Sequence, residues 1–224
     1  MVNYIVLDLE MCMIDKYLRT REYNMKHEII QIGSVKLNER FEEVSRFSTF
    51  VKPKYGSVNT FIKDLTGITR GNVARAEELS KAIEVFLNWV GDGEAFCVSW
   101  SMSDKYQLKK EMKAKGIVNE RLNSFYSSWI DCQKLFADKA RTERCWNLSE
   151  ALNASGIEPK GHTHNGLMDS INTAMLFKKL MTEDDFNMVE SYEKARYAEV
   201  DHLSVPIGDL LDISDLTIKN RSGI

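Results

Sequence analysis

The sequence is poor in the residues that interrupt a fold. It contains 3 prolines and 12 glycines among 224 residues, so no flexible or proline-rich linker divides it and a single core is expected. Hydrophobic residues make up 43% and charged residues 28% of the chain, which excludes the disordered and collagen-like classes. No apolar run reaches the roughly 18 residues of a membrane span, and we expect no association with a membrane.

The cysteines are few and scattered. Cys12, Cys97, Cys132 and Cys145 form no C-x-x-C pair, so neither a zinc ribbon nor a disulfide framework is predicted. The first residues, MVNYIVLDLEMC, have no basic region and reach carboxylates after a short apolar run, which argues against a signal peptide. These features predict a reduced, cytoplasmic protein.

The charge is balanced overall but distributed unevenly. The net charge is −3, which does not by itself identify a protein that binds polyanions. Residues 182–224 hold ten acidic and four basic side chains, a net −6, and this leaves +3 for residues 1–181. We therefore expect a mildly basic domain over residues 1–181 and an acidic C-terminal extension over residues 182–224. The extension is expected to pack on the domain or to lie at an interface.

The apolar pattern predicts an α/β fold whose elements follow the order βββαβαβαα. Runs rich in apolar and β-branched residues indicate strands, and apolar residues at the 3.6 period indicate helices. The predicted strands lie at about 4–7, 28–37, 47–51, 95–100 and 128–131, and the predicted helices at about 79–90, 104–116, 147–156 and 169–181. Short polar connections between the first three strands favour an antiparallel meander.

Two carboxylates lie at the end of the first predicted strand. Because side chains alternate along a strand, Asp8 and Glu10 share one face while Leu7 and Leu9 share the other. Adjacent anions at the end of an apolar strand repel each other unless a cation or solvent compensates. A divalent cation bound through oxygen is the simplest compensation, and the alternative is a strand that ends in water at Asp8.

Three further candidate groups occur later in the chain. Asp104 follows the strand that ends at Trp100, where a carboxylate on its own could simply cap a helix. His164 lies on a glycine-flanked loop, and Asp169 begins the last predicted helix five residues later. A lone histidine is usually a surface residue, but His162 and His164 are two of only four histidines in the chain. Their clustering indicates a functional loop.

This ordered combination resembles the DEDDh class of 3′-5′ exonucleases. The pattern is Asp-x-Glu on the first strand, Asp after the middle strand and His-x4-Asp before the last helix. The resemblance extends over residues 1–181. It includes segments that look like the second strand, the third strand and the nucleotide-cradling turn of the family, at Glu28–Gly33, Phe50–Pro53 and Leu65–Thr69.

Gly166-Leu167 and Asp169-Ser170 are similar to one branch of this class. That branch contains the enhanced-RNAi exonucleases and the bacterial sporulation-inhibitor exonucleases. The resemblance implies an RNase H-like α/β fold, with a mixed sheet that begins with three antiparallel strands and carries helices on both faces.

The resemblance also implies a set of catalytic roles. Asp8, Glu10, Asp104 and Asp169 would hold two Mg²⁺ or Mn²⁺ ions for a two-metal hydrolysis. His164 would be the general base, because an imidazole with a pKa near 6.5 accepts a proton at working pH. The implied substrate is the 3′ end of single-stranded nucleic acid, with RNA slightly favoured over DNA. The implied products are nucleoside 5′-monophosphates.

A site for the last nucleotide is implied as well. Met11, Leu65, Thr66 and Ile68, together with His164, match positions that meet this nucleotide in the family through backbone groups and apolar contacts. Apolar contact with a base face tolerates any base, so low sequence specificity is expected. For Leu65 and Ile68 the alternative is core packing.

Three positions depart from the pattern of the branch. His162 stands where Arg is common, Met168 stands where an acidic residue is common, and Ser101 replaces the Gly that usually follows the Trp. None of the three belongs to the five expected catalytic residues. Activity is therefore expected to survive, while the substrate preference is left open.

Two other functions remain to be distinguished. A regulatory module of the same fold could bind nucleic acid without turnover, although it would have no evident reason to keep the clustered charge. An RNase H-like endonuclease could also carry clustered carboxylates. The His164-x4-Asp169 pattern and the Leu65–Ile68 turn favour the exonuclease, and a circular substrate, which only an endonuclease cleaves, separates the two enzymes.

Overall fold

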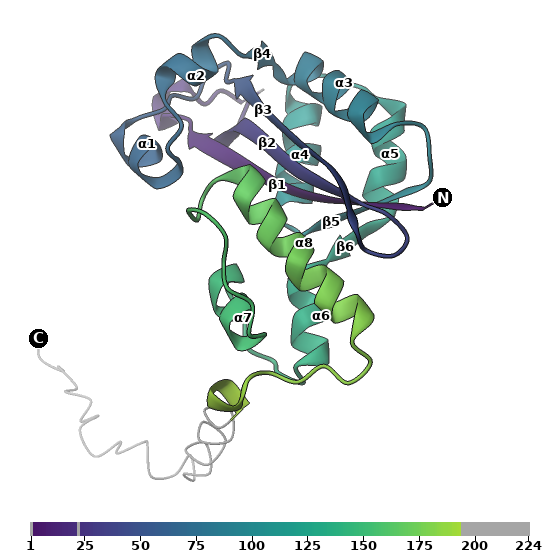
Figure 1. Cartoon of the computed structure of the whole chain (residues 1–224). Helices are drawn as coiled ribbons and strands as arrows, with labels where there is room; N and C mark the ends of the chain where they lie inside the picture. Colours follow the sequence, from purple (N-terminus) through teal and green to yellow (C-terminus); the bar gives the residue numbers. More distant parts are fainter. Residues whose placement is uncertain (1, 22, 194–224) are drawn as a thin grey trace, which may run out of the picture. The chain divides into compact units, whose positions relative to one another are not determined.

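The chain is built on a mixed sheet of six strands (Figure 1). The computed structural model describes residues 2–21 and 23–193. The strands lie side by side in the order β4-β3-β2-β1-β5-β6. Their bounds are β1 Asn3–Met13, β2 His27–Leu37, β3 Glu43–Lys52, β4 Glu77–Glu78, β5 Ala95–Ser99 and β6 Trp129–Asp131. Strands β1, β2 and β3 form the predicted antiparallel meander, and β5 and β6 continue the sheet in parallel with β1.

Helices cover both faces of the sheet, as predicted. Helices α3 (Leu79–Val90), α4 (Ser103–Ala114) and α5 (Glu120–Ser127) share one apolar cluster with β1 and β2. Helix α8 (Gly166–Thr182) packs across β1 and β2 from the opposite face (Figure 1). The shorter helices are η1 Lys16–Leu18, α1 Thr60–Thr66, α2 Arg70–Ala74, α6 Cys132–Lys139 and α7 Leu148–Ala154.

The alternation along β1 decides which side chains meet α8. Ile5, Leu7 and Leu9 are at most 4% exposed and belong to the apolar cluster beneath α3 and α4. Asp8 and Glu10 therefore project from the face that α8 covers. A bulge follows at once, where the register of β1 on β2 shifts between Glu10 and Met11. The bulge shifts the register beside the two carboxylates, a common arrangement next to functional sites, and the pairing resumes at Met11.

The predicted helices match the structure where the apolar stripe is strong. Helix α3 has the bounds expected from its stripe, and Gly91 ends it with a positive φ of 82°. Helix α8 begins three residues before its predicted start at Asp169, because the Asn165 side chain accepts a hydrogen bond from the Met168 N–H and caps the helix at Gly166.

Four short helices were not predicted. Helices α1, α2, α5 and α6 have five to eight residues, too few for a clear 3.6 period. Capping residues were the available signal. Asn59 caps α1, and Thr69 forms a reciprocal capping box with Asn72 at the start of α2. Gly67, with φ of 74°, ends α1 and makes the turn that was expected there.

The predicted domain boundary at residue 181 stays a prediction. Helix α8 ends at Thr182, and residues up to Asn187 form one compact unit. Most of the predicted acidic extension, residues 194–224, lies outside the described residues. Among the helices that the structure describes, none is long and apolar enough to cross a membrane.

Helix α8 lies so close to β2 that a glycine is required at the contact. A Cβ atom added to Gly33 would lie 2.0 Å from the carbonyl carbon of Gly166 and 2.2 Å from the backbone nitrogen of Leu167. Both neighbours are backbone atoms, so a rotamer change cannot relieve the overlap. Gly33 thereby sets how closely the start of α8 approaches the sheet.

We expect Gly33→Ala to destabilise the fold by about 1–3 kcal/mol or more, because α8 must move away from β2. Gly71→Ala is the matched control. A Cβ at Gly71 would make only ordinary contacts at 3.6 Å, and alanine in a helix is favoured by about 0.5–1 kcal/mol over glycine. Urea unfolding of the two variants measures the difference, and equal stability would contradict the close contact.

Candidate active site

The carboxylates predicted from the sequence gather where β1 meets the start of α8. The three closest carboxylates belong to Asp8, Glu10 and Asp169. One oxygen from each of them lies within 4.8 Å of the other two. Glu10 is buried, while Asp8 and Asp169 are half-buried and line an open cleft. Residues separated by about 160 positions in the chain are thus brought to one point by the packing of α8 on β1.

Asp104 lies behind this group, on the first turn of α4. Its Oδ1 atom accepts a hydrogen bond of 3.1 Å from the backbone N–H of Leu9, so Asp104 is fixed directly against the strand that carries Asp8 and Glu10. The side chain is 7% exposed. It interacts electrostatically with Asp8, Glu10 and Asp169, which places all four carboxylates in one electrostatic cluster.

Burial and mutual repulsion make these carboxylates hard to ionise. Burial, followed by the charges of Asp169 and Asp104, raises the pKa of Glu10 to about 8. Burial raises the pKa of Asp104 to about 7 against the hydrogen bond from Leu9. The pKa of Asp8 is raised well above its ordinary range by burial and then by Asp104, Glu10 and Asp169. Burial also raises the pKa of Asp169, although the His164 N–H opposes this.

The residues present fit a divalent metal. None of the ion pairs found among the described residues involves Asp8, Glu10, Asp104 or Asp169. Their oxygens are hard ligands of the kind that Mg²⁺ and Mn²⁺ bind. A bound cation would favour the ionised form of each carboxylate and so reverse the rise in pKa.

His164 lies beside the cluster on the loop before α8. Its backbone N–H donates a hydrogen bond of 2.7 Å to Asp169 Oδ2. The residue has φ of 62°, a left-handed conformation that is unusual for histidine. The main chain is thus bound to a metal-ligand candidate, while the exposed imidazole lines the cleft together with Asp8 and Asp169.

Two hydrogen-bonded amides fix the ends of this loop, and the sequence did not reveal them. Gln31 is 3% exposed, and its Oε1 accepts a hydrogen bond from the Gly166 N–H. Asn172, on α8, exchanges two hydrogen bonds with the backbone of Lys160. In the sequence, Gln31 and Asn172 are each a polar residue within an apolar strand or helix. Such a residue can be buried with a hydrogen-bond partner or can face solvent, and the sequence does not distinguish the two.

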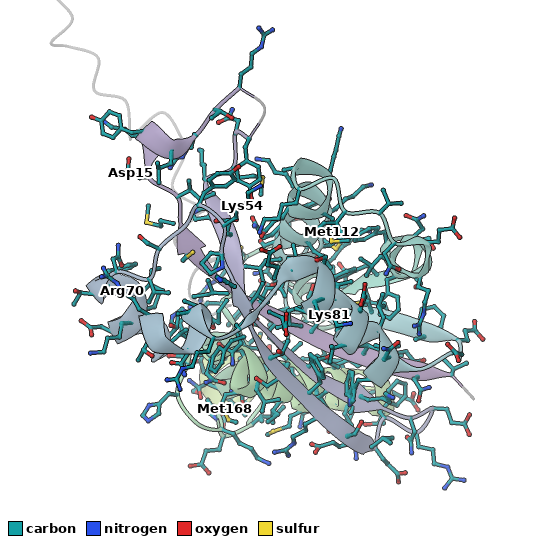
Figure 2. The ribbon with its side chains drawn as sticks, turned by 90° about the horizontal axis from the view of Figure 1, so that it is seen from above. Asp15, Lys54, Arg70, Lys81, Met112 and Met168 are labelled. Carbon is teal, nitrogen blue, oxygen red and sulfur yellow. The ribbon has the colours of Figure 1, made fainter. Side chains whose placement is uncertain are left out.

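The residues expected to meet the last nucleotide are divided by the structure. Met11, Leu65 and Thr66 line a cavity of about 340 Å³ that also contains Asp8, Glu10, His164 and Asp169. We call this cavity the first lobe. Phe61, which is 63% exposed, and Met13 add apolar surface to it. Figure 2 labels Arg70, the first residue of α2, and Met168, on the first turn of α8.

Ile68 is the exception among these residues. It is 2% exposed and packs with Cys12, Ile30 and Ile62 in a separate apolar cluster. Core packing, the alternative considered for Ile68, is therefore what the structure shows. Its contribution to the lobe is indirect, because Ile68 N–H donates to the Thr66 hydroxyl, which in turn donates to the carbonyl of Ile62.

The three departures from the branch pattern are not among the residues that line the cavities at the carboxylates. His162 is exposed, Met168 is half-buried on the first turn of α8, and Ser101 donates a hydrogen bond to Ser103, the first residue of α4. Met168 packs against the loop before α8, because a Cβ at Gly161 would lie 2.7 Å from the Met168 sulfur. The acidic residue that is common at this position in the branch would add a negative charge there.

Comparison with known proteins agrees with this arrangement. The profile of the RNase_T exonuclease family matches residues 5–177. The chain is 27% identical over 187 residues to 3′-5′ exoribonuclease 1 of Rattus norvegicus, covering 77% of this chain and 53% of that protein. It is 29% identical over 194 residues to ERI1 exoribonuclease 2 of Homo sapiens, covering 72% and 26%. The chain thus spans about half or less of the length of these relatives.

Solved structures share the fold. The nuclease domain of 3′hExo, a DEDDh family member solved with bound rAMP, superimposes with a TM-score of 0.68 at 23% identity, over 84% of this chain and 96% of that one. A 3′-exonuclease solved in a study of the recognition of the histone mRNA stem-loop gives a TM-score of 0.69 at 20% identity, over 82% and 83%.

The match of the family profile to most of the chain, the shared fold and the order of the acidic residues agree with one another. The chain belongs to the RNase_T exonuclease family.

Proposed function

We propose that this chain is a metal-dependent 3′-5′ exonuclease that removes nucleoside 5′-monophosphates from the 3′ end of single-stranded nucleic acid. The observation that carries the proposal is the cluster of Asp8, Glu10 and Asp169 oxygens within 4.8 Å of one another, open to a cleft. So much unpaired negative charge is costly without a cation. The same cation is what phosphodiester hydrolysis requires.

The four carboxylates of the cluster would hold two Mg²⁺ or Mn²⁺ ions, with Asp104 fixed by its hydrogen bond to Leu9. When bound, such ions supply an activated water and stabilise negative charge on the leaving oxygen. An imidazole nitrogen of His164 takes the proton from the attacking water. The water oxygen bonds to phosphorus, the bond from phosphorus to the 3′ oxygen breaks, and that oxygen leaves with the electron pair.

Single-stranded RNA is the substrate we favour, with DNA as the second choice. The names of the curated relatives, 3′-5′ exoribonuclease 1 and ERI1 exoribonuclease 2, support RNA. The apolar walls of the first lobe contact bases without reading their edges, which supports low sequence specificity. The proposal keeps the cytoplasmic location that the unpaired cysteines predict.

The main alternative is a regulatory module that binds nucleic acid without turnover. Wild-type protein is incubated with 5′-labelled single-stranded RNA or DNA in Mg²⁺, Mn²⁺ or EDTA, and with a circular strand. We expect a ladder that shortens from the 3′ end, no ladder in EDTA and no cleavage of the circle. Binding without cleavage would support the module, and cleavage of the circle would support an endonuclease.

Asp8→Ala is expected to reduce hydrolysis to the EDTA background, because it removes a ligand from the centre of the cluster. It should also abolish the metal-linked rise in melting temperature, which for a site filled at 100 times its Kd corresponds to about 2.7 kcal/mol. Asp92→Asn, on an exposed carboxylate outside the cleft, is the control. A fully active Asp8→Ala would refute the proposed function.

His164→Ala is expected to lower kcat by about 10²- to 10⁴-fold, the usual contribution of a general base. Metal-linked stabilisation should persist, because only the imidazole is lost and the backbone bond to Asp169 remains available. His162→Ala, two residues earlier and exposed, controls for a general effect on the loop. Unchanged turnover in His164→Ala would rule out the imidazole as the base.

The stability of the metal-free protein should depend on pH in a defined direction. A carboxyl whose folded pKa is raised binds its proton more tightly in the folded state, so its contribution is present at low pH and lost as pH rises. For Glu10 the window runs from 4.5 to about 8. We expect the melting temperature in EDTA to fall across this window, and Mg²⁺ or Mn²⁺ to restore it most at the alkaline end.

The comparison with Asp8→Asn isolates the cluster from other titrating groups. Removing one charge relieves the repulsion, so the fall with pH should be smaller in this variant and the restoration by metal weaker. Parallel pH curves for the two proteins would show that the cluster does not govern this dependence.

A further inference from the structure

The cleft at the carboxylates has a second lobe on the other side of Asp8. This second lobe is a cavity of about 590 Å³ lined by Trp100, Asn147, Leu148, Ser149 and Thr163. It shares Asp8, His164 and Asp169 with the first lobe. The proposed scissile phosphate therefore lies where the two lobes join, and each lobe is positioned to receive one of the two nucleotides that this phosphate links.

Gln133 joins the two walls of the second lobe through hydrogen bonds. Its backbone N–H donates a hydrogen bond of 2.7 Å to the carbonyl of Trp100. Its side-chain Nε2 donates to the carbonyl of Trp146, the residue before Asn147. The start of α6 thus joins the segment after β5 to the segment before α7, and these two segments face each other across the lobe.

One phenylalanine ring contacts an aromatic residue of each wall. The ring of Phe136, which is fully buried, lies with its centroid 6.4 Å from that of Trp100 and 5.3 Å from that of Trp146. The guanidinium of Arg144 lies over the Trp146 ring, 4.5 Å from its centroid. Trp100 is half-buried, so this supported indole keeps part of its surface exposed in the lobe.

The chemistry of the lobe suits a nucleotide. Trp100 and Leu148 offer an indole and an apolar side chain, and base stacking on aromatic rings is strong and tolerant of sequence. Asn147, Ser149 and Thr163 add neutral hydrogen-bonding groups. Apart from the shared carboxylates, the lining residues carry no charge that would repel a phosphate.

We propose that the second lobe binds the nucleotide on the 5′ side of the scissile phosphate, with its base against Trp100. The proposal rests on the proposed function and deepens it. The smaller first lobe then holds the terminal nucleotide, which leaves as the monophosphate. The second lobe holds the end that remains on the strand, and its exposed rim at Asn147 and Thr163 lets the strand continue into solvent.

The test separates the two lobes by their ligands. An oligonucleotide fills both lobes, whereas AMP, as a product inhibitor, fills only the first. Trp100→Ala should raise KM for a 5′-labelled single-stranded oligonucleotide by about fivefold or more, and leave the inhibition constant of AMP within about twofold. Trp100→Phe keeps an aromatic face and should restore most of the affinity. Leu65→Ala, in the first lobe, should weaken inhibition by AMP.

Two further variants keep the test decisive. Ser149→Trp narrows the second lobe without removing any core side chain, and should raise KM for the oligonucleotide with the AMP constant unchanged. Tyr106→Ala removes an aromatic ring that is 62% exposed on α4, outside both lobes, and should change neither constant. Melting temperatures confirm that each variant is folded.

The outcomes distinguish this inference from the proposed function. If the wild-type chain releases no mononucleotide, the proposed function fails and the inference fails with it. If the wild-type chain is active but both Trp100→Ala and Ser149→Trp leave KM unchanged, only the second-lobe assignment is overturned. The assignment is also overturned if Trp100→Ala raises the inhibition constant of AMP by the same factor as KM for the oligonucleotide.

Discussion

Repulsion among buried carboxylates is the constraint around which this molecule is organised. Asp8, Glu10 and Asp169 approach within 4.8 Å at positions where burial already disfavours charge. Nothing in their own interaction holds them together. The surrounding fold must supply the attraction, through the pairing of β1 with β2, the apolar contacts of α8 and the hydrogen bond that ties Asp104 to Leu9. A bound cation would relieve this repulsion, and it would therefore couple the stability of the fold to the chemistry of the site.

The packing of α8 on the sheet holds the carboxylates together against this repulsion. Gly33 allows the backbone of Gly166 to approach β2 without an intervening side chain. Gln31, paired with Glu10 across the strands, then satisfies the Gly166 N–H, and Ser48 accepts from the other end of the Gln31 amide. Because α8 packs so closely on the sheet, Asp169 is held near Asp8 and the two carboxylates have little freedom to move apart. Catalysis depends on this kind of preorganisation.

Much of this was predictable from the sequence, because the relevant signals are local. The alternation of Leu7, Asp8, Leu9 and Glu10 placed both carboxylates on one face, and the stripe of α3 gave its bounds to the residue. What could not be predicted depends on contacts between distant residues. The side chains of Gln31 and Asn172 are polar groups buried by partners more than ten positions away, and a local pattern cannot distinguish such a residue from an exposed one. Ile68 could not be assigned for the same reason, since its core partners come from several elements.

The two amide anchors also set a length. Asn172 fixes the chain at Lys160, and Gln31 fixes it at Gly166. Only residues 161–165 span the interval between these fixed points, with His164 near its end. Within it Gly161 has a positive φ of 68° and Asn165 caps α8, so both ends of the interval are constrained by their own side-chain requirements. An inserted or deleted residue would alter the path itself and rotate the imidazole away from the cleft. The number of residues in the segment should therefore stay constant over evolutionary time.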